Sequence, residues 1–471
     1  MGENTVTQLD YIFKPRSIAI IGASNDPQKW GNWSIDRSLN ASFKGNIYPI
    51  NYNESEILGI PAFPNILDVP EKVDLAVIST PASVMSQAMA ECAKKKVKGA
   101  VVITGGFAEI GEEGEALQKE LVKIARQGNI RFVGPNSPGI TNSAVGLMVG
   151  ASPRTDSGSI AFISQSGTLS EVMIRKTQRK GYGLSKFIGI GNQADLNAAD
   201  YLEYLAQDEA TKVIVLYVEG FPEGRKFFDV AREVTKKKPV IIYKVGRTLA
   251  GGRATLSHTA SLTGNDELFE SLCKQAGIIR AYEVDHAFDM AEALATQPLP
   301  EGNRVGIISG GGALCVIIAE QCAFLGLEVP EFDEDTKVSL HKELAPYVPI
   351  PKNPVDTVTA LESPTTVAML TEKVIQLPYI DGVITNPRLV GVGGEKSISE
   401  TETQRAIEAI QPIVAISQKY NKPIVALVYN LVEPKEALHI LREANIPYYE
   451  TPEECARAMF ALAKYSEFLR Y

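Results

Sequence analysis

Short apolar runs followed by small polar residues recur along the chain. Three of them share one pattern, an apolar strand, a loop of small residues and a helical stretch: SIAIIGAS (17–24), SIAFISQSGTLS (159–170) and RVGIISGGGALC (304–315). They are spaced almost evenly. An apolar run that feeds a Gly/Ser turn is typical of the first β–α unit of a doubly wound fold. The pattern therefore predicts three α/β domains.

Within each predicted domain, further apolar runs alternate with amphipathic stretches, which indicates mainly parallel sheets covered by helices. The predicted strands are 17–21, 46–50, 74–80, 99–104 and 130–134, then 160–164, 186–191, 212–220 and 239–246, then 305–309, 380–385 and 423–429, and 84–96 is one of the predicted helices. Breaks are expected at 134–150, which lacks clear periodicity, and at 297–303. The fold class is α/β, with Rossmann/flavodoxin-like domains over 1–134, 151–296 and 302–471.

Composition and charge narrow the class of protein. The chain is 45% hydrophobic and 22% charged, as in soluble globular proteins, and its net charge of -9 argues against a nucleic-acid partner. The five cysteines form no CxxC pair, which favours reduced thiols. The N-terminus lacks a signal-peptide pattern, and no apolar run approaches the ~20 residues of a membrane span. We expect a cytoplasmic protein that neither crosses a membrane nor binds nucleic acid.

The loop after the first strand, GASNDPQKWGN (22–32), suggests a ligand site in the first domain. It lacks the GxGxxG spacing, and the second strand ends in Asn51 rather than in a ribose-binding acid, so NAD is disfavoured. Ser24, Asn25 and Lys29 offer polar groups and a cation at a helix start, which suits a phosphorylated ligand. The segment 104–107 lies at the same expected edge. The alternative is that these glycines only make tight turns.

In the second domain, SQSGTLSE (164–171) has the character of a phosphate cradle. Its small residues permit close backbone approach, and Thr168 with Glu171 has the spacing of a capping box at a helix start. An ordinary capped helix explains the segment equally well. The chain has no P-loop, because it contains no Gly-Lys dipeptide.

Two further residues have the chemistry of a nucleophile and its partner. Glu219 follows the apolar run VIVLYV, so its carboxylate is expected at the functional edge of the sheet. His258 lies in LSHTASLTG (256–264), expected to be a loop before a helix that begins near Asp266. A carboxylate near an imidazole fixes its tautomer and leaves the other nitrogen free to attack. A solvated loop histidine is the alternative.

Other interpretations of the same residues are weaker. Ser257 lacks the GxSxG context of a hydrolase nucleophile. No second histidine or cysteine lies at ligand spacing from His258, so we expect no metal site. The histidines at 286, 341 and 439 lie in helical-looking stretches without companions, and we interpret them as structural or surface residues.

Taken together, the motifs resemble the alpha subunits of the ADP-forming acyl-CoA synthetases, specifically the archaeal-type ADP-forming acetate–CoA ligases. The resemblance covers essentially the whole chain and includes SQSGTLSE, GNQADLN (191–197), YVEGFPEG (217–224) and SHTASLTG (257–264). The SHTAS context differs from the Gly-His-Ala-Gly-Ala pattern of the succinate enzymes, and the shorter succinate-type alpha chain lacks a third domain. Both differences favour the acetate group.

The resemblance implies an acid–thiol ligase that converts acyl-CoA, ADP and phosphate into acid, ATP and CoA, through an acyl phosphate and a phosphorylated His258. It assigns Glu219 to orient His258. It places the phosphate and acyl sites at Gln165, Ser166, Gly167, Thr168, Asn192 and Gln193. It places the CoA site at Gly22, Ala23, Ser24, Lys29, Asn51, Thr80, Thr104 and Gly105.

The resemblance also implies a partner. The family binds ADP or ATP, with Mg²⁺, on an ATP-grasp module, and no such module is evident here. We therefore expect a separate beta subunit, in an α2β2 assembly, and a mobile segment that carries His258 between two sites. Two alternatives stay open: a CoA-binding regulatory or acyltransferase component without ligase turnover, and an NAD-dependent oxidoreductase, which the missing GxGxxG motif disfavours.

Overall fold

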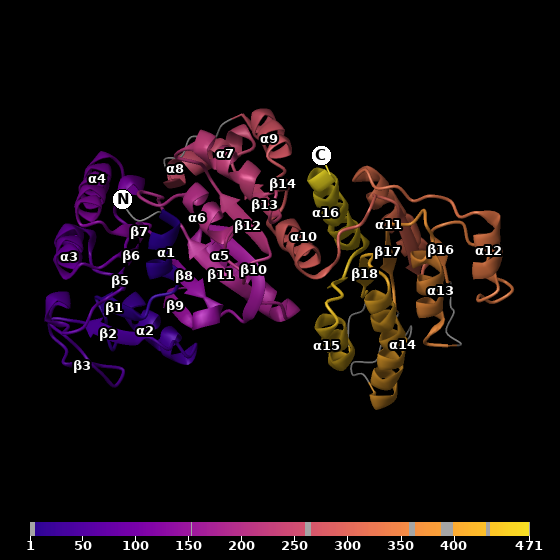
Figure 1. Cartoon of the computed structure of the whole chain (residues 1–471), viewed down its shortest axis with the longest axis horizontal. Coiled ribbons are helices and arrows are strands. Elements are labelled where there is room, and N and C mark those ends of the chain that lie inside the picture. Colours follow the sequence, from indigo (N-terminus) through magenta and orange to yellow (C-terminus); the bar gives the residue numbers. More distant parts are fainter. Residues whose placement is uncertain are drawn as a thin grey trace. The chain divides into compact units, whose positions relative to one another are not determined.

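Among the residues described in this computed structural model of the 471-residue chain, alternating strands and helices build three large sheets, and two further strands form a small sheet of their own. The structure describes residues 5–151, 153–259, 265–357, 363–387, 399–429 and 434–470. Contacts divide the chain into two units, Met1–Val284 and Asp285–Tyr471. The first unit holds two of the three sheets and the second unit holds the third (Figure 1).

The first sheet is parallel throughout, in the order β2-β1-β5-β6-β7. Its strands are β1 Ser17–Ile21, β2 Asn46–Ile50, β5 Leu75–Ile78, β6 Gly99–Val102 and β7 Arg131–Val133, and its helices are α1 Thr5–Phe13, α2 Trp30–Asn40, α3 Ala82–Lys95 and α4 Glu112–Gln127. The same part of the chain contains a separate small hairpin, β3 Glu56–Ile57 with β4 Ile60–Pro61, and two 3₁₀ turns, η1 Ile66–Asp68 and η2 Ala108–Ile110. All five predicted strands are confirmed.

Burial on both faces explains why these strands appear in the sequence as continuous apolar runs. Every residue of β1 is buried. Ile18 and Ile20 belong to one hydrophobic cluster, and Ala19 and Ile21 belong to another. Successive side chains of a strand point to opposite faces, so a sheet covered by helices on both sides needs apolar residues at every position.

The second sheet has the order β14-β13-β12-β10-β11-β8-β9. Its strands are β8 Gly139–Asn142, β9 Leu147–Gly150, β10 Ser157–Ser164, β11 Leu184–Gly189, β12 Val213–Val218, β13 Val240–Lys244 and β14 Ile279–Ala281, and η3 Ser143–Val145 joins the first two. Its helices are α5 Gly167–Lys180, α6 Ala198–Leu205, α7 Gly224–Val234, α8 Leu249–Thr259 and α9 Asp266–Gln275. The four strands predicted here are confirmed.

The expectation that 134–150 lacks regular structure is wrong. Strands β8 and β9 form an antiparallel hairpin there, and β8 pairs antiparallel with β11. The hairpin extends the second sheet. The segment begins with two glycines and two prolines, whose turn signals hid two strands of four residues each. The three-domain division itself remains a proposal.

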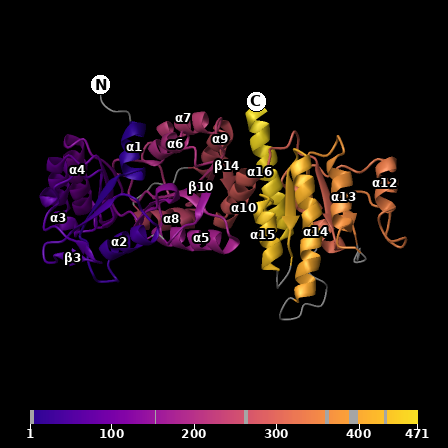
Figure 2. The ribbon, with the colours of Figure 1, turned by 60° about the horizontal axis from the view of Figure 1, so that its bottom comes forward.

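The third sheet, in the second unit, is parallel in the order β16-β15-β17-β18-β19. Its strands are β15 Val305–Ser309, β16 Val355–Asp356, β17 Gly382–Thr385, β18 Ile424–Leu427 and β19 Tyr448–Tyr449, and its helices are α10 Val284–Thr296, α11 Gly312–Phe324, α12 Glu334–His341, α13 Thr366–Ile375, α14 Glu400–Lys419, α15 Lys435–Glu443 and α16 Pro452–Arg470. Helix α13 packs against α14, side by side in Figures 1 and 2, and α11 packs against α16.

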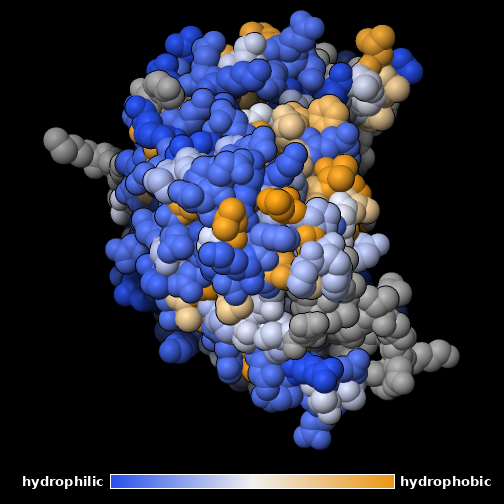
Figure 3. Space-filling model, turned by 90° about the vertical axis from the view of Figure 1, so that its right-hand side faces the viewer, coloured by the Kyte–Doolittle hydropathy of each residue, from blue (hydrophilic) through white to orange (hydrophobic). Residues whose placement is uncertain are grey.

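All three sheets share one strand order. Their parallel strands follow the order 2-1-3-4-5 of flavodoxin-like sheets, and ligands of such sheets bind outside the carboxyl ends of the strands. The three predicted α/β openings are therefore confirmed as β1, β10 and β15, each the first parallel strand of its sheet along the chain. Among the described helices, none is long and apolar enough to cross a membrane. The face drawn in Figure 3 is mainly hydrophilic, with hydrophobic side chains scattered over it.

Candidate functional site

The carboxyl end of β1 opens into the loop predicted to bind CoA. Gly22 there has φ of 89°, a backbone conformation that residues with a side chain rarely adopt. A Cβ at this position would lie 2.9 Å from Ser79 Oγ. Gly31, in the first turn of α2, lies still closer to this loop, because a Cβ on it would be 2.1 Å from the Gly22 carbonyl oxygen. The two glycines let the helix start rest directly on the loop.

Side-chain amides hold the same loop from two sides. Asn51, after β2, donates from Nδ2 to the Ala23 carbonyl over 2.7 Å, and Asn32 donates to the Ser24 carbonyl over 3.0 Å. Ala23 and Ser24 are buried, whereas Lys29, just before α2, is exposed. The structure thus brings four of the predicted CoA residues together at the edge of the sheet and places Lys29 beside them at the surface.

The remaining predicted CoA residues follow β5 and β6. Thr104 Oγ1 donates to the Thr80 carbonyl over 2.7 Å. The Thr80 hydroxyl is buried and has no hydrogen-bond partner among the described residues. Gly105 is tightly surrounded, since a Cβ on it would lie 3.0 Å from Glu109 Oε1 and 3.1 Å from Asn136 Oδ1. An unused hydroxyl and a close backbone approach are features that a polar ligand exploits.

A polar link that the sequence did not reveal joins this edge to the second sheet. Asn192, after β11, donates from Nδ2 to Glu109 Oε2 over 2.5 Å and to Gln118 Oε1 over 3.0 Å. Asn136 donates from its backbone to the Thr104 carbonyl over 2.9 Å and from its side chain to Asn192 Oδ1 over 3.4 Å. The predicted acyl residue Asn192 therefore lies beside the predicted CoA loop.

The segment 134–139, expected to be a break, makes this junction. Ser137 donates from its backbone to the Val102 carbonyl over 3.3 Å and from Oγ to the Gly189 carbonyl over 2.5 Å, so it ties the end of β6 to the end of β11. Sequence reasoning missed Glu109 and Asn136 as neighbours of the site. Their signal was a polar side chain in a loop that follows a strand, which is common on any surface.

Two glutamines converge on the end of β12. Gln165 accepts at Oε1 from the backbone N–H of Glu219 over 2.5 Å and from that of Gly220 over 3.2 Å. Gln193, with φ of 55°, donates from Nε2 to the Gly220 carbonyl over 3.3 Å and accepts at Oε1 from Ala198 N–H over 3.1 Å. Residues from three separate motifs thus surround the backbone that follows β12.

The phosphate-cradle motif opens helix α5, but one residue pair was assigned wrongly. Ser166 is the N-cap and accepts from the Leu169 N–H over 3.3 Å, so the expected capping box of Thr168 and Glu171 is wrong. The helix begins two residues earlier, and Glu171 pairs with Arg175 at 2.8 Å instead. Gly167 and Thr168 take the first two positions of the helix. Their backbone N–H groups have no carbonyl acceptor within the helix. With the helix dipole, these N–H groups favour an anion.

Glu219 occupies the predicted position, and His258 does not. Glu219 directly follows β12 and is only 4% exposed. Burial, together with the nearby charge of Glu219, raises the pKa of Tyr217 well above its ordinary value. The backbone of His258 belongs to helix α8, so the prediction of a loop at this position is wrong. The side chain of His258 and residues 260–264 lie outside the described part of the chain, and the pairing of His258 with Glu219 stays a prediction.

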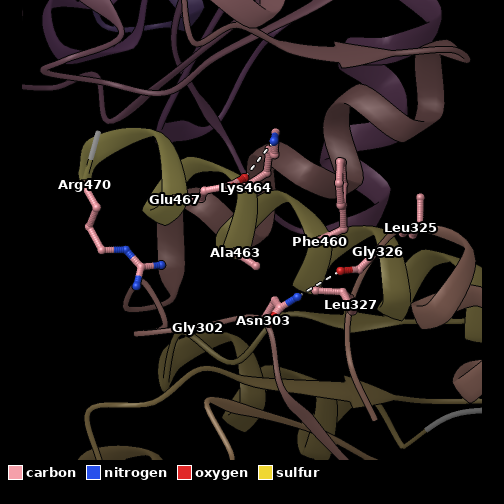
Figure 4. Close-up of a pocket in the computed structure, with 10 residues that line it drawn as sticks. All are labelled: Gly302, Asn303, Leu325, Gly326, Leu327, Phe460, Ala463, Lys464, Glu467 and Arg470. Carbon is pink, nitrogen blue, oxygen red and sulfur yellow. Dashed lines mark hydrogen bonds and ion pairs between the residues drawn. The ribbon is translucent and has the colours of Figure 1, made fainter.

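A separate cavity of about 510 Å³ opens in the second unit (Figure 4). Apolar side chains of the lining include Leu325, Leu327 and Phe460, and its charged side chains are Arg470 and the ion pair of Lys464 with Glu467, whose Nζ and Oε2 lie 2.7 Å apart. It contains none of the predicted site residues. Among the described residues, no three His, Cys, Asp or Glu side chains lie together in a way that could hold a metal ion.

The chain is similar in sequence to known protein families and to individual proteins. A CoA binding domain family matches residues 16–143, and a succinyl-CoA ligase like flavodoxin domain family matches residues 157–294. The chain is 39% identical to the alpha subunit of acetate–CoA ligase [ADP-forming] II from Pyrococcus furiosus, over 97% of both chains. It is 35% identical to the alpha subunit of enzyme I from the same organism, over 98% of both.

A solved structure is similar throughout. An acetyl-coenzyme A synthetase from Ca. Korarchaeum cryptofilum, in complex with phosphate and ADP, superposes with a TM-score of 0.87, at 34% identity and over 98% of both chains. The word alpha in the names of the two relatives implies a partner subunit for them. The likeness therefore extends over the whole chain rather than over single motifs.

Proposed function

The chain belongs to the family of ADP-forming acetate–CoA ligase alpha subunits, and on this premise we propose that it performs the acyl and phosphoryl half of the ligase reaction with His258 as the phosphoryl carrier. The overall reaction converts acyl-CoA, ADP and phosphate into acid, ATP and CoA, so the enzyme makes ATP by substrate-level phosphorylation. The alternative of a CoA-binding component without ligase turnover is not favoured, because the relatives that match the whole chain are ligases.

The chemistry proceeds in three displacements. A phosphate oxygen attacks the thioester carbonyl, and the C–S bond breaks to give an acyl phosphate and CoA. A neutral His258 nitrogen then attacks phosphorus, forms an N–P bond and releases the carboxylate. Finally the terminal oxygen of ADP attacks the phosphohistidine, so the N–P bond breaks and ATP forms. Imidazole serves this relay because it is both a nucleophile and a leaving group near neutral pH.

The CoA site is assigned to the carboxyl edge of the first sheet. The proposed contacts are Gly22, Ala23, Ser24, Lys29, Asn51, Thr80, Thr104 and Gly105. Support comes from the family match over 16–143, from the Thr80 hydroxyl, which has no hydrogen-bond partner among the described residues, and from Gly22 and Gly105, where neighbouring atoms leave no room for a Cβ. Exposed Lys29 supplies the positive charge that the CoA phosphates require.

The phosphate and acyl sites are assigned to the second sheet. Ser166, Gly167 and Thr168 would cradle the phosphoryl group at the start of α5, and Asn192 with Gln193 would line the acyl site. The observation that carries the proposal is the hydrogen bond of 2.5 Å from the Glu219 N–H to Gln165 Oε1, because it fixes the buried carboxylate beside the loop that begins the phosphate helix. Glu219 would orient the His258 ring.

The ADP site is assigned to a partner. We propose a beta subunit with an ATP-grasp domain, in an α2β2 assembly, that holds ADP or ATP with Mg²⁺. The proposed location is the cytoplasm. Support comes from the names of the relatives, which are alpha subunits, and from the need of His258 to meet both an acyl phosphate and ADP. The segment around His258 would then move between the two sites during turnover.

Phosphoryl labelling tests the proposal. The assembled enzyme is incubated with ATP labelled at the γ-phosphate, and the alpha chain is examined for acid-labile label, as expected of an N–P bond. His258→Ala should abolish the label. His439→Ala, at an exposed histidine on α15, should label like wild type and serves as the matched control. If His258→Ala labels as well as the control, the assignment of the phosphoryl carrier is wrong.

A further inference from the structure

The Glu109 carboxylate lies between the two sheets of the first unit and binds groups on both sides. Oε1 accepts from the backbone N–H of Gly106 over 2.5 Å and from that of Phe107 over 3.1 Å, which fixes the loop after β6. Oε2 accepts from Asn192 Nδ2 over 2.5 Å, and Asn192 follows β11 of the other sheet. One carboxylate thus spans from a predicted CoA loop to a predicted acyl residue.

The neighbours of this carboxylate leave it little freedom. Gly105 packs against it, since a Cβ there would lie 3.0 Å from Glu109 Oε1. Asn192 is held from three directions: it donates to Glu109 and Gln118 and accepts from Asn136, which in turn donates from its backbone to the Thr104 carbonyl. These hydrogen bonds form a ring that runs from the Gly105 loop through Glu109, Asn192 and Asn136 and back to Thr104 at the start of the same loop.

Two further observations connect Glu109 with the reaction. The turn that carries it, η2, lies against α8, the helix that contains His258. Although burial opposes ionisation, hydrogen bonds from Asn192 and from the backbone N–H groups lower the pKa of Glu109. The carboxylate is therefore charged at neutral pH, and its hydrogen bonds are of the stronger, charge-assisted kind.

We infer that Glu109 is a positioning residue, whose carboxylate fixes the Gly105–Phe107 loop of the CoA site against Asn192 of the acyl site and so sets the distance between thioester and phosphate. The inference rests on the proposed function, since it concerns the same two sites. Only a carboxylate satisfies both sides, because both sides present N–H donors. A carboxamide in the same place has one oxygen, so its NH₂ group would face a donor on one side.

The test separates the two half-reactions of the assembled enzyme. Glu109→Gln should phosphorylate His258 from ATP at a rate within about twofold of wild type, because that step needs no CoA. Discharge of the phosphoenzyme by acetate and CoA should slow about 10- to 100-fold, with a raised KM for CoA. Glu113→Gln, an exposed glutamate in the first turn of α4, is the control for the charge change and should behave as wild type in both steps.

Three further measurements keep the result decisive. Asn192→Ala combined with Glu109→Gln should discharge no more slowly than the worse single variant, because the two side chains act as one unit. Glu109→Asp keeps the charge but is shorter by one methylene, so it should lie between Gln and wild type in the discharge rate. Calorimetry with CoA on the full chain should give a Kd about tenfold higher for Glu109→Gln.

Two results would overturn the inference. One is discharge by Glu109→Gln at the rate of the Glu113→Gln control. The other is an equal loss in both half-reactions together with a lowered Tm, which would mean that Glu109 only stabilises the fold. If wild type itself takes no label from ATP, the proposed function fails, while the CoA titrations of the Glu109 variants still decide the positioning role.

Discussion

Replacing Gly31 by alanine tests whether the contact between α2 and the Gly22 loop forms the CoA site. A Cβ at this position would lie 2.1 Å from the Gly22 carbonyl oxygen and 2.8 Å from its carbonyl carbon, whereas ordinary contacts begin at 3.4 Å. Both atoms are backbone, so no side chain can turn aside. The helix and the loop must therefore separate by about 1 Å.

The separation has a cost in stability and a cost in binding. Overpacking of this kind lowers the free energy of unfolding by about 1–3 kcal/mol. Alanine also reduces the conformational entropy of the unfolded chain relative to glycine, but this offsets less than about 1 kcal/mol of the loss. For a domain of 150–250 residues, each kcal/mol corresponds to about 2–4 °C in Tm, so a loss of about 1–3 kcal/mol should lower the Tm of Gly31→Ala by about 2–12 °C. A shift of about 1 Å in the loop N–H groups should weaken CoA binding about 10- to 100-fold.

Gly224→Ala is the matched control. Gly224 is also in the first turn of a helix, α7, and a Cβ there meets nothing within 4 Å. This variant should keep the wild-type Kd for CoA and melt at the same temperature or slightly higher. The assays are isothermal calorimetry with CoA and calorimetric melting of the full chain. Equal Kd and equal Tm for the two variants would refute the reasoning.

Three further changes probe other contacts. Asp381 is 4% exposed and accepts from Arg304 Nε over 2.7 Å and from Arg304 Nη2 over 2.8 Å. Burial by itself would raise the pKa of Asp381, but the hydrogen bonds and the positive charge of Arg304 outweigh it and lower the pKa. The ionised Asp381 carboxylate stabilises the fold fully above its unfolded pKa near 4, and this stabilisation is lost as the pH falls through the lower folded pKa. Asp381→Asn should therefore lower Tm at pH 7 by the equivalent of about 1–3 kcal/mol and weaken the decrease of Tm in acid. An unchanged dependence of Tm on acid pH would contradict this. Lys186→Met should lose about 3–5 kcal/mol in denaturant unfolding, because the Nζ–Oδ2 pair with Asp208 at 2.6 Å is buried, and adding Asp208→Leu should recover most of the loss. Gln165→Leu removes the acceptor of two buried backbone N–H groups after β12, so kcat should fall about 10- to 100-fold, and Tm should fall by the equivalent of about 1–3 kcal/mol; an unchanged kcat would refute the role of that acceptor.

Sequence patterning was sufficient for the elements whose burial is continuous. The strands around Ile20, Ile163 and Ile307 were predicted because each apolar run is covered by helices on both sides. The start of α9 at Asp266 was also predicted, since its acidic first turn and the Asn265 cap are local signals. A helix cap and an acidic first turn depend only on residues that are close in the sequence, so the sequence alone predicts them.

Errors occurred where a local signal was weak or shared by two structures. The hairpin of β8 and β9 was missed because its strands are short and follow a turn-rich segment. The capping box at Thr168 was wrong because the spacing Ser/Thr-x-x-Glu occurs by chance, and Ser166 competes for the same helix start. The helix at His258 was missed because glycines at 251 and 252 have a low helix propensity, which neighbouring structure overrode.

The sequence by itself determined the fold class, the longer buried strands and the loops at their carboxyl ends, because periodicity reports burial and small residues report close backbone approach. It does not report which neighbour provides the burial. Only the tertiary structure decided that Glu109 meets Asn192, 83 positions away, and that Ser137 ties the ends of β6 and β11 together. Such contacts depend on how the two sheets of the first unit are joined, and a polar residue in a loop has the same pattern whether it faces water or another loop.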